Sequence, residues 1–275
     1  MSSGFRGLVV VRGAGDLASG AILRLSRSGF RVAALEIAEP MAIRRGVAFS
    51  EAVYDGEVTV EGLTARRAAS ARDVFQLSNE GVVPILVDPL ALSLPALSPL
   101  ALVDAILAKR NLGTNPGMAP IVVALGPGFE APRDAFAVVE TNRGHDLGRV
   151  IMKGSAEADT GVPGTIGGRS SERVVRAPIR GRIEALRAIG DIVAAGDPIF
   201  AVRDLETGLA TVARSPIDGA LRGLIRHGIE VEAGLKAADV DPRGEISHCF
   251  TVSDKARAVA GGVLEALLAL GARPD

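Results

Sequence analysis

One segment near the N-terminus constrains the fold more than any other, because an apolar run there meets two closely spaced glycines. Leu8–Val11 is apolar and mostly β-branched, Gly13 and Gly15 follow, and apolar residues at helical spacing begin with Leu17. In a strand–turn–helix context the pattern Gly-x-Gly-x-x-Ala indicates a phosphate site, since amides at a helix start favour an anion. We predict that the turn binds a nucleotide through Gly13, Ala14, Gly15, Asp16, Leu17 and Ala18. Tight packing of strand on helix, without a ligand, is the alternative interpretation.

An acidic residue follows at the distance typical of dinucleotide-binding turns. Glu36 lies near the end of a second predicted strand, Val32–Ile37, about 20 residues beyond the second glycine. At this separation a carboxylate usually accepts hydrogen bonds from a ribose hydroxyl. Arg44 and Arg45 are predicted to pair with a further phosphate, and a solvated helix face is the alternative for both.

Strands and helices alternate through the first half of the chain. Strands are predicted at Leu8–Val11, Val32–Ile37, Val58–Val60, Val82–Val87 and Ile121–Leu125, and helices at Leu17–Ser26, Ile43–Val53, Ala69–Leu77 and Leu102–Lys109. This alternation predicts an α/β fold with a Rossmann-like, doubly wound parallel sheet over residues 1–150. Such sheets bind ligands at the carboxyl ends of their strands, where the strand order reverses.

Further candidate residues are expected at the same end of that sheet. Asp88 ends the fourth predicted strand, and Gly126 and Gly128 follow the fifth, so we predict that all three line one cleft. The alternatives are a capping role for Asp88 and a sharp turn for the glycines. Arg143, His145 and Asp146 stand in a polar turn and are predicted to contact an anionic ligand or transfer a proton, unless the turn is only solvated. Asp88 and His145 are therefore the candidate catalytic residues.

The second half of the chain contains an internal repeat. Arg176–Gly181 recurs as Arg214–Gly219, and Gly190–Gly196 recurs as Gly228–Gly234, both with an offset of 38 residues. Duplicated segments with glycines at their turns predict two equivalent β units that share one core. The pattern resembles the half-motifs of biotinyl/lipoyl-like barrels, the hammerhead fold.

The repeat predicts a second domain over residues 172–275, a β-rich hammerhead barrel followed by a C-terminal helix. A connection rich in Gly and Ser, residues 151–171, joins it to the first domain. Ser253 is predicted to cap the C-terminal helix. Lysine is absent between the two halves, where carrier domains present theirs, and Lys255 comes too late in the chain. We therefore predict a structural or docking module rather than a cofactor carrier.

Composition argues against several other classes of protein. The formal net charge is −1, and the chain has no Trp and one Tyr, so nucleic acid is not an expected partner. Cys249 is the single cysteine, which excludes an intrachain disulfide, and the three histidines are too scattered to predict a metal site. Four prolines interrupt the apolar stretch Val82–Val103, so no membrane span is predicted. With no secretory signal either, we expect a cytoplasmic protein, in which an oligomer is possible.

Several motifs occur in order along nearly the whole chain. They are Arg12–Ala18, Leu35–Ile37 with Pro40 and Ile43–Arg45, Glu51–Tyr54, Ala124–Phe129, Arg143–Gly148 and Thr251–Ala256. With these motifs the chain resembles the accessory proteins of the selenium-dependent molybdenum hydroxylase system, which are distantly related to xanthine dehydrogenase accessory factors. The resemblance implies a nucleotide-binding domain before the barrel and a role in maturing a partner molybdenum hydroxylase. It implies no particular catalytic residue.

Three functions follow as hypotheses. The first is a maturation factor that binds a dinucleotide, such as the molybdopterin dinucleotide cofactor, and delivers it to a molybdenum hydroxylase. The second is an NAD(P)-dependent oxidoreductase, for which Asp88 and His145 are the available general acids. The third is a non-catalytic adaptor that docks through the barrel. Whether the protein is an enzyme stays open at this point.

Overall fold

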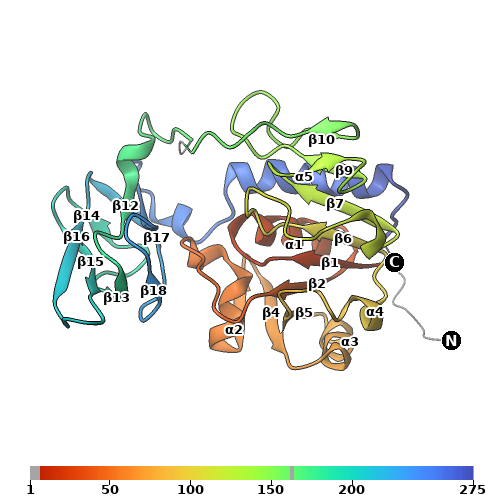
Figure 1. The fold of residues 1–275 in the computed structure, drawn as a ribbon, viewed down its shortest axis with the longest axis horizontal. Coiled ribbons are helices and arrows are strands. Elements are labelled where there is room, and N and C mark those ends of the chain that lie inside the picture. Colours follow the sequence, from red (N-terminus) through yellow and green to blue (C-terminus); the bar gives the residue numbers. More distant parts are fainter. Residues whose placement is uncertain (1–6, 162–163, 275) are drawn as a thin grey trace. The chain divides into compact units, whose positions relative to one another are not determined.

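The computed structural model describes residues 7–161 and 164–274 and divides into two compact units (Figure 1). The first unit contains the described residues of 1–40, 48–160 and 252–275, and the second contains those of 41–47 and 161–251. The C-terminal segment thus packs within the first unit, although the sequence suggested a domain over 172–275. Among the described residues, no helix has the length and apolar character needed to cross a membrane.

The first unit is built on a mixed sheet with the strand order β10-β9-β7-β6-β1-β2-β5-β4-β3 in the described chain. Neighbouring strands from β9 to β4 are parallel, whereas the edge strands β10 and β3 are antiparallel to their neighbours. The bounds are β1 Leu8–Arg12, β2 Arg31–Glu36, β3 Glu57–Val60, β4 Leu63–Ala68, β5 Val83–Val87, β6 Ala101–Asp104, β7 Ile121–Leu125, β9 Ala137–Val139 and β10 Val150–Ile151. A small second sheet pairs β8 (Glu130–Ala131) with β11 (Gly154–Ser155). The parallel strands end together at one side of the sheet, which we call the carboxyl edge.

Helices cover both faces of this sheet. On one face, α3 (Ala71–Asn79) and α4 (Leu94–Leu97) pack on the core that includes Val10 of β1. Val9 and Val11 point to the opposite face, by the alternation of a strand, and are also fully buried. That face carries α1 (Asp16–Arg27) beside α5 (Asp254–Ala269), and α5 also packs on β7 and β9 (Figure 1). Ser253 caps α5 as predicted, because its side chain accepts the Ala256 amide at 3.1 Å.

The structure corrects the first half of the expected fold. The sheet is mixed, and two predicted crossover helices are absent from the described chain. Leu102–Lys109 begins inside β6, because a short apolar run fits a buried strand as well as a helix. Ile43–Val53 contains the 3₁₀ turns η1 (Arg45–Val47) and η2 (Phe49–Glu51), and α2 (Ala52–Asp55) begins only at its end. The Ile43 carbonyl accepts the Leu224 amide of the second unit at 2.8 Å, which prevents a continuous helix here.

The second unit consists of two four-stranded antiparallel sheets around one core. Their orders in the described chain are β12-β19-β17-β14 and β16-β15-β13-β18. The bounds are β12 Val174–Arg176, β13 Gly181–Ala185, β14 Ile192–Val193, β15 Pro198–Arg203, β16 Ala210–Arg214, β17 Gly219–Leu224, β18 Glu230–Val231 and β19 Lys236–Asp241. Each sheet combines strands from both copies of the sequence repeat, so neither copy can bury its apolar face alone.

The repeat is visible in individual contacts of the second unit. A Cβ atom at Gly181 would lie 2.2 Å from the Arg203 carbonyl oxygen, and one at Gly219 would lie 2.3 Å from that of Asp241. Both glycines therefore allow the same close approach of two strands. This architecture replaces the expected hammerhead barrel with C-terminal helix: the unit is a pair of small antiparallel sheets, and the helix belongs to the first unit.

Candidate anion-binding site at the carboxyl edge

Of the two glycines in the predicted phosphate turn, packing explains why glycine is needed at one position but not at the other. Gly13 has a φ of +94°, and a Cβ atom there would lie 2.9 Å from the carbonyl oxygen of Ala105, just after β6. Packing of the turn against β6 thus requires Gly13. Gly15 has an ordinary φ of −72°, and its Cβ position has no heavy atom within 4 Å among the described residues. Packing gives no reason for glycine at position 15, so that side of the turn is open.

The backbone amides at the start of α1 also lack the side-chain acceptor that usually caps a helix, within the part of the chain that the structure describes. Gly15 occupies the N-cap position, and within the described chain no side chain caps this helix. The first amides of a helix have no intrahelical acceptor and carry the positive end of its dipole. An open turn beside uncapped amides is suited to binding a phosphate.

Other residues hold the turn in this shape. The Ala14 amide donates to Glu36 Oε2 at 2.7 Å, and the Ile37 amide donates to Glu36 Oε1 at 2.8 Å. Burial raises the pKa of Glu36, and these two hydrogen bonds oppose the rise. The Ala14 carbonyl accepts from Ser19 Oγ at 3.0 Å and from the Ser50 amide at 2.9 Å. Glu36 therefore supports the turn from within the protein.

Helix α5 places a second helix start at the same edge. Near the starts of the two helices, a Cβ atom on Gly20 would lie 2.9 Å from that of Ala256. Just beyond their ends, the Cβ position of Gly29 lies 3.3 Å from Pro274. The two helices consequently run parallel, and both positive dipole ends point to the carboxyl edge.

The parallel packing of α1 and α5 brings one cation, Lys255 at the start of α5, close to the Gly13–Gly15 turn. Burial lowers its pKa, and the charge of Arg143 lowers it further, whereas Asp16, Glu140 and Asp159 act in the opposite direction. The next residue, Ala256, packs against Gly20 of α1, so the backbone of Lys255 lies beside the first turns of that helix. Across the described residues, Lys255 has no hydrogen bond or ion pair that satisfies its ammonium group. An anion at the turn would supply the missing partner.

A buried polar network lies beneath the turn. Arg12 ends β1 beside Asp104, its register partner at the end of β6, and the two side chains are paired. Thr114 bonds to both of them, and Arg12 Nη2 also donates to the Pro89 carbonyl at 3.2 Å. Each of these three side chains is almost fully buried. The network fixes the ends of β1 and β6, where the strand order reverses.

Asp88, Gly126 and Gly128, which were predicted to line the cleft, each have a structural role in the first unit. Asp88 accepts the Leu92 and Ser93 amides at 2.9 and 2.7 Å, which is the capping alternative. Burial pushes the pKa of Asp88 up, but its bonds to Ser93 and Leu92 and the charge of Arg12 hold it below its ordinary value. Cβ atoms at Gly126 and Gly128 would collide with the Thr141 side chain and the Arg110 backbone.

The last four candidates come from two separate parts of the chain, and the hydrogen bonds seen for the three arginines go to residues outside the Gly13–Gly15 turn. Arg143 donates from Nη1 and Nη2 to the carboxylate of Asp254 at 2.8 Å each, at the start of α5, and His145 is exposed. Arg44 and Arg45 belong to the second unit. There Arg44 donates to backbone carbonyls of residues 248 and 251, and Arg45 donates to that of residue 224.

Sequence reasoning therefore located the turn but missed Lys255, Arg12 and Asp104 as parts of its surroundings. A charged residue at the end of an apolar strand was the available signal for Arg12 and Asp104. Lys255 is brought to the turn by packing between the two ends of the chain, which no local pattern encodes. In the described parts of the chain, no three His, Cys, Asp or Glu side chains are grouped to hold a metal ion.

No family model matches the chain. It is 51% identical over 263 residues to the uncharacterized protein YqeB of Escherichia coli K12, a match that covers 96% of this chain and 48% of that protein. The chain thus spans about half the length of the curated relative that it matches.

Solved structures show a weak likeness. The ectoine utilization protein EutE (DoeB) from Ruegeria pomeroyi matches with a TM-score of 0.25 and 12% identity, over 85% of this chain and 52% of that one. An aspartoacylase family protein from Mesorhizobium loti matches with a TM-score of 0.30 and 13% identity, over 86% and 84%. A succinylglutamate desuccinylase/aspartoacylase from Rhodobacter sphaeroides gives 0.29 and 15%, over 86% and 85%. With TM-scores this low, none of the activities named for these structures is assigned to this chain.

These findings correct the expected family and function. None of these proteins is described as an accessory factor of molybdenum hydroxylases or as an NAD(P)-dependent oxidoreductase, and the solved structures are desuccinylase and aspartoacylase family proteins. The expected family resemblance and the maturation role with a selenium-dependent partner enzyme are therefore wrong. The same holds for the oxidoreductase and adaptor alternatives. The expected fold class, a Rossmann-like sheet followed by a hammerhead barrel, is also wrong.

Proposed function

We propose that the first unit binds a small molecule through a phosphate or pyrophosphate group at the Gly13–Gly15 turn. The observation that carries this proposal is the open space at Gly15, where neither packing nor backbone conformation requires glycine. A residue without a side chain at that position lets a phosphate reach the amides of α1. The dinucleotide expected from the sequence belongs to this ligand class and stays a proposal.

The charge arrangement supports the same ligand class. Lys255 is a cation near the turn without an ion-pair partner in the described chain, and the positive ends of α1 and α5 face the same edge. Charge-assisted hydrogen bonds to phosphate are among the stronger polar contacts in proteins. Glu36 and the Arg12 network keep the turn fixed, so binding requires little ordering of the protein.

Replacing Gly15 with Asp tests the proposal directly. Asp is a favoured N-cap residue, so the variant should fold at least as well as the wild type. Its carboxylate would occupy the open side and repel an anion, and we expect the affinity for inorganic pyrophosphate to fall about tenfold in calorimetric titrations. Gly15→Asn is the matched control, because it caps the helix without adding charge. Equal pyrophosphate affinity in wild type and Gly15→Asp would overturn the proposal.

Binding should also depend on pH through Lys255. Because burial lowers the pKa of this group, its charged form is lost at a lower pH than for an ordinary lysine. An anion binds the charged form, so affinity should be highest below this pKa and should decrease as pH rises through it. Sulfate is the appropriate probe, since its own charge is constant in this range. A sulfate affinity that is flat with pH, or that rises, would contradict the role of Lys255.

A further inference from the structure

An apolar groove lies on the first unit, on the face of the large sheet that carries α3 and α4. Its volume is about 750 Å³. The lining comes from residues between 91 and 99, among them Pro95 and Ser98, and from residues 116–120, and none of these lining residues carries a charge. Pro95, Ser98 and Pro120 are exposed, whereas Met118 is half-buried and packs on the core of this face. The groove therefore presents accessible apolar side chains to solvent.

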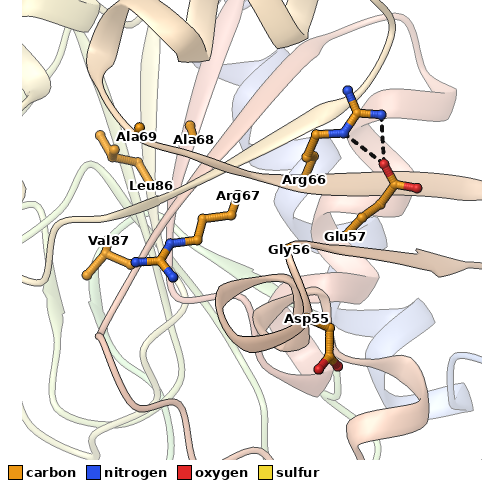
Figure 2. Close-up of a pocket in the computed structure, with 9 residues that line it drawn as sticks. All are labelled: Asp55, Gly56, Glu57, Arg66, Arg67, Ala68, Ala69, Leu86 and Val87. Carbon is orange, nitrogen blue, oxygen red and sulfur yellow. Dashed lines mark hydrogen bonds and ion pairs between the residues drawn. The ribbon is translucent and has the colours of Figure 1, made fainter.

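A second cavity of the first unit shows the contrast with a charged lining. It lies at the ends of α2 and β4, and its volume is about 740 Å³. In Figure 2 the Arg66 and Glu57 side chains form an ion pair there, at 2.7 Å. Water solvates such side chains well, so this cavity requires no occupant. The apolar groove offers water few polar groups, and covering it would be favourable.

The groove is present because only short elements cover this part of the sheet. Crossovers between parallel strands are usually α-helical and cover the face of the sheet. Between β5 and β6 the helix α4 has four residues, and from β6 to β7 the described chain contains the 3₁₀ turn η3 (Pro116–Met118) but no α-helix. Pro116 and Pro120 have no amide donor, which disfavours a longer helix here. The helical layer is therefore incomplete at the groove.

Three exposed leucines continue the apolar surface on neighbouring loops. Leu90 is 71% exposed, Leu92 is 77% exposed and Leu112 is 46% exposed. The Arg12 side chain holds the two loops together, because it donates to the carbonyl just before Leu90 and to the hydroxyl of residue 114. Asp88 accepts the Leu92 amide at 2.9 Å, which fixes the first loop. A continuous apolar surface of this kind marks an interaction site.

The length of the curated relative indicates what covers this surface. The match with YqeB of Escherichia coli covers 48% of that protein, so about half of YqeB has no counterpart in these 275 residues. We propose that the groove and the three leucines dock an apolar face of the polypeptide that corresponds to this further half of YqeB. The core of a protein interface is depleted of charged residues, as the lining of the groove is. The docking surface does not rest on the proposed function.

Thiol labelling tests this proposal with the intact proteins. Ser98→Cys replaces only an exposed hydroxyl of the groove with a thiol. The single native cysteine, Cys249, is buried, and burial raises its pKa, so it contributes little background. Maleimide labelling is compared between the 275-residue chain and intact YqeB with a cysteine at the aligned position, and peptide mass spectrometry resolves the sites. We expect labelling to be at least about tenfold slower in YqeB, where the further half covers the groove.

Two further variants make the comparison specific. Leu92→Cys is a second probe, on an exposed loop position beside the groove, and it should be protected in YqeB in the same way. Ser155→Cys is the matched control, because Ser155 is exposed in the first unit but does not line the groove. The control should react at the same rate in both proteins.

The proposal fails if both groove probes react equally fast in the two proteins, or if the Ser155 control slows as much as they do. It also fails if labelling of the 275-residue chain slows as its own concentration rises, because a second copy is then the occupant. Slow labelling of that chain even when it is dilute would contradict the proposal too. Inorganic pyrophosphate should leave the labelling rates unchanged, so the anion site and the docking surface are judged by separate measurements.

Discussion

Replacing Lys255 with Met should weaken pyrophosphate binding by about 10- to 100-fold, the effect expected for losing a hydrogen bond to a charged group. The same variant should be at least as stable as the wild type. Burial disfavours the charge of Lys255, and no ion pair within the described chain compensates it. Met keeps the length of the side chain and removes the charge that the fold disfavours. Loss of affinity together with unchanged or higher stability is characteristic of a residue retained for binding.

Calorimetric titration and urea unfolding of the same preparations measure the two quantities. Lys153→Met is the matched control, because Lys153 is exposed in the first unit and its removal changes net charge equally. We expect that control to bind pyrophosphate normally. A Lys255→Met variant that is clearly less stable, or that binds as tightly as the wild type, would show that this side chain serves the fold.

Replacing Gly262 with Ala should destabilise the first unit by about 1–3 kcal/mol, the usual cost of overpacking. A Cβ atom there would lie 2.7 Å from Val139 Cγ1, and it would also collide with the Gly148 carbonyl oxygen. Backbone atoms cannot yield as a flexible side chain does, so α5 would have to move away from the sheet. Because α5 carries Lys255, pyrophosphate affinity should decrease as well.

The neighbouring glycine provides the control. Gly261 lies in the same helix, and its Cβ position has no heavy atom within 4 Å in the described chain. Gly261→Ala should therefore stabilise the protein by up to about 1 kcal/mol through helix propensity alone. Urea midpoints that shift in opposite directions for the two variants would support the close contact of α5 with the sheet. Equal shifts would contradict it.

Local patterns predicted part of the local structure, although two of the expected helices were wrong. The strand at Leu8–Val11 and the helix from Leu17 correspond to β1 and α1, and the repeat of the second half corresponds to equivalent strands such as β13 and β17. In each case the signal is short-range: a β-branched run, helical spacing, or a glycine that permits a close approach. The same is true of Ser253, whose hydroxyl caps the helix that follows.

Features that depend on distant parts of the chain were not predictable in this way. Nothing near α1 in sequence indicates that α5 packs beside it, so Lys255 could not be placed at the turn. The segment from Ile43 was predicted to be helical, but the Ile43 carbonyl accepts a hydrogen bond from the Leu224 amide in β17. The family resemblance drew on motifs such as Ala124–Phe129, whose glycines the structure explains by packing. Motifs that packing requires are shared by unrelated functions, and this is why they misdirected the assignment.

Amide chemical shifts of the labelled protein, followed by NMR during a titration with inorganic pyrophosphate, test the central claim most directly. If the uncapped start of α1 receives the anion, the amides of Gly15, Asp16 and Leu17 will shift saturably, and the Lys255 side-chain signal will shift with the same midpoint. Signals that stay in place at these four residues while the protein remains folded, or that move only elsewhere, would contradict the claim.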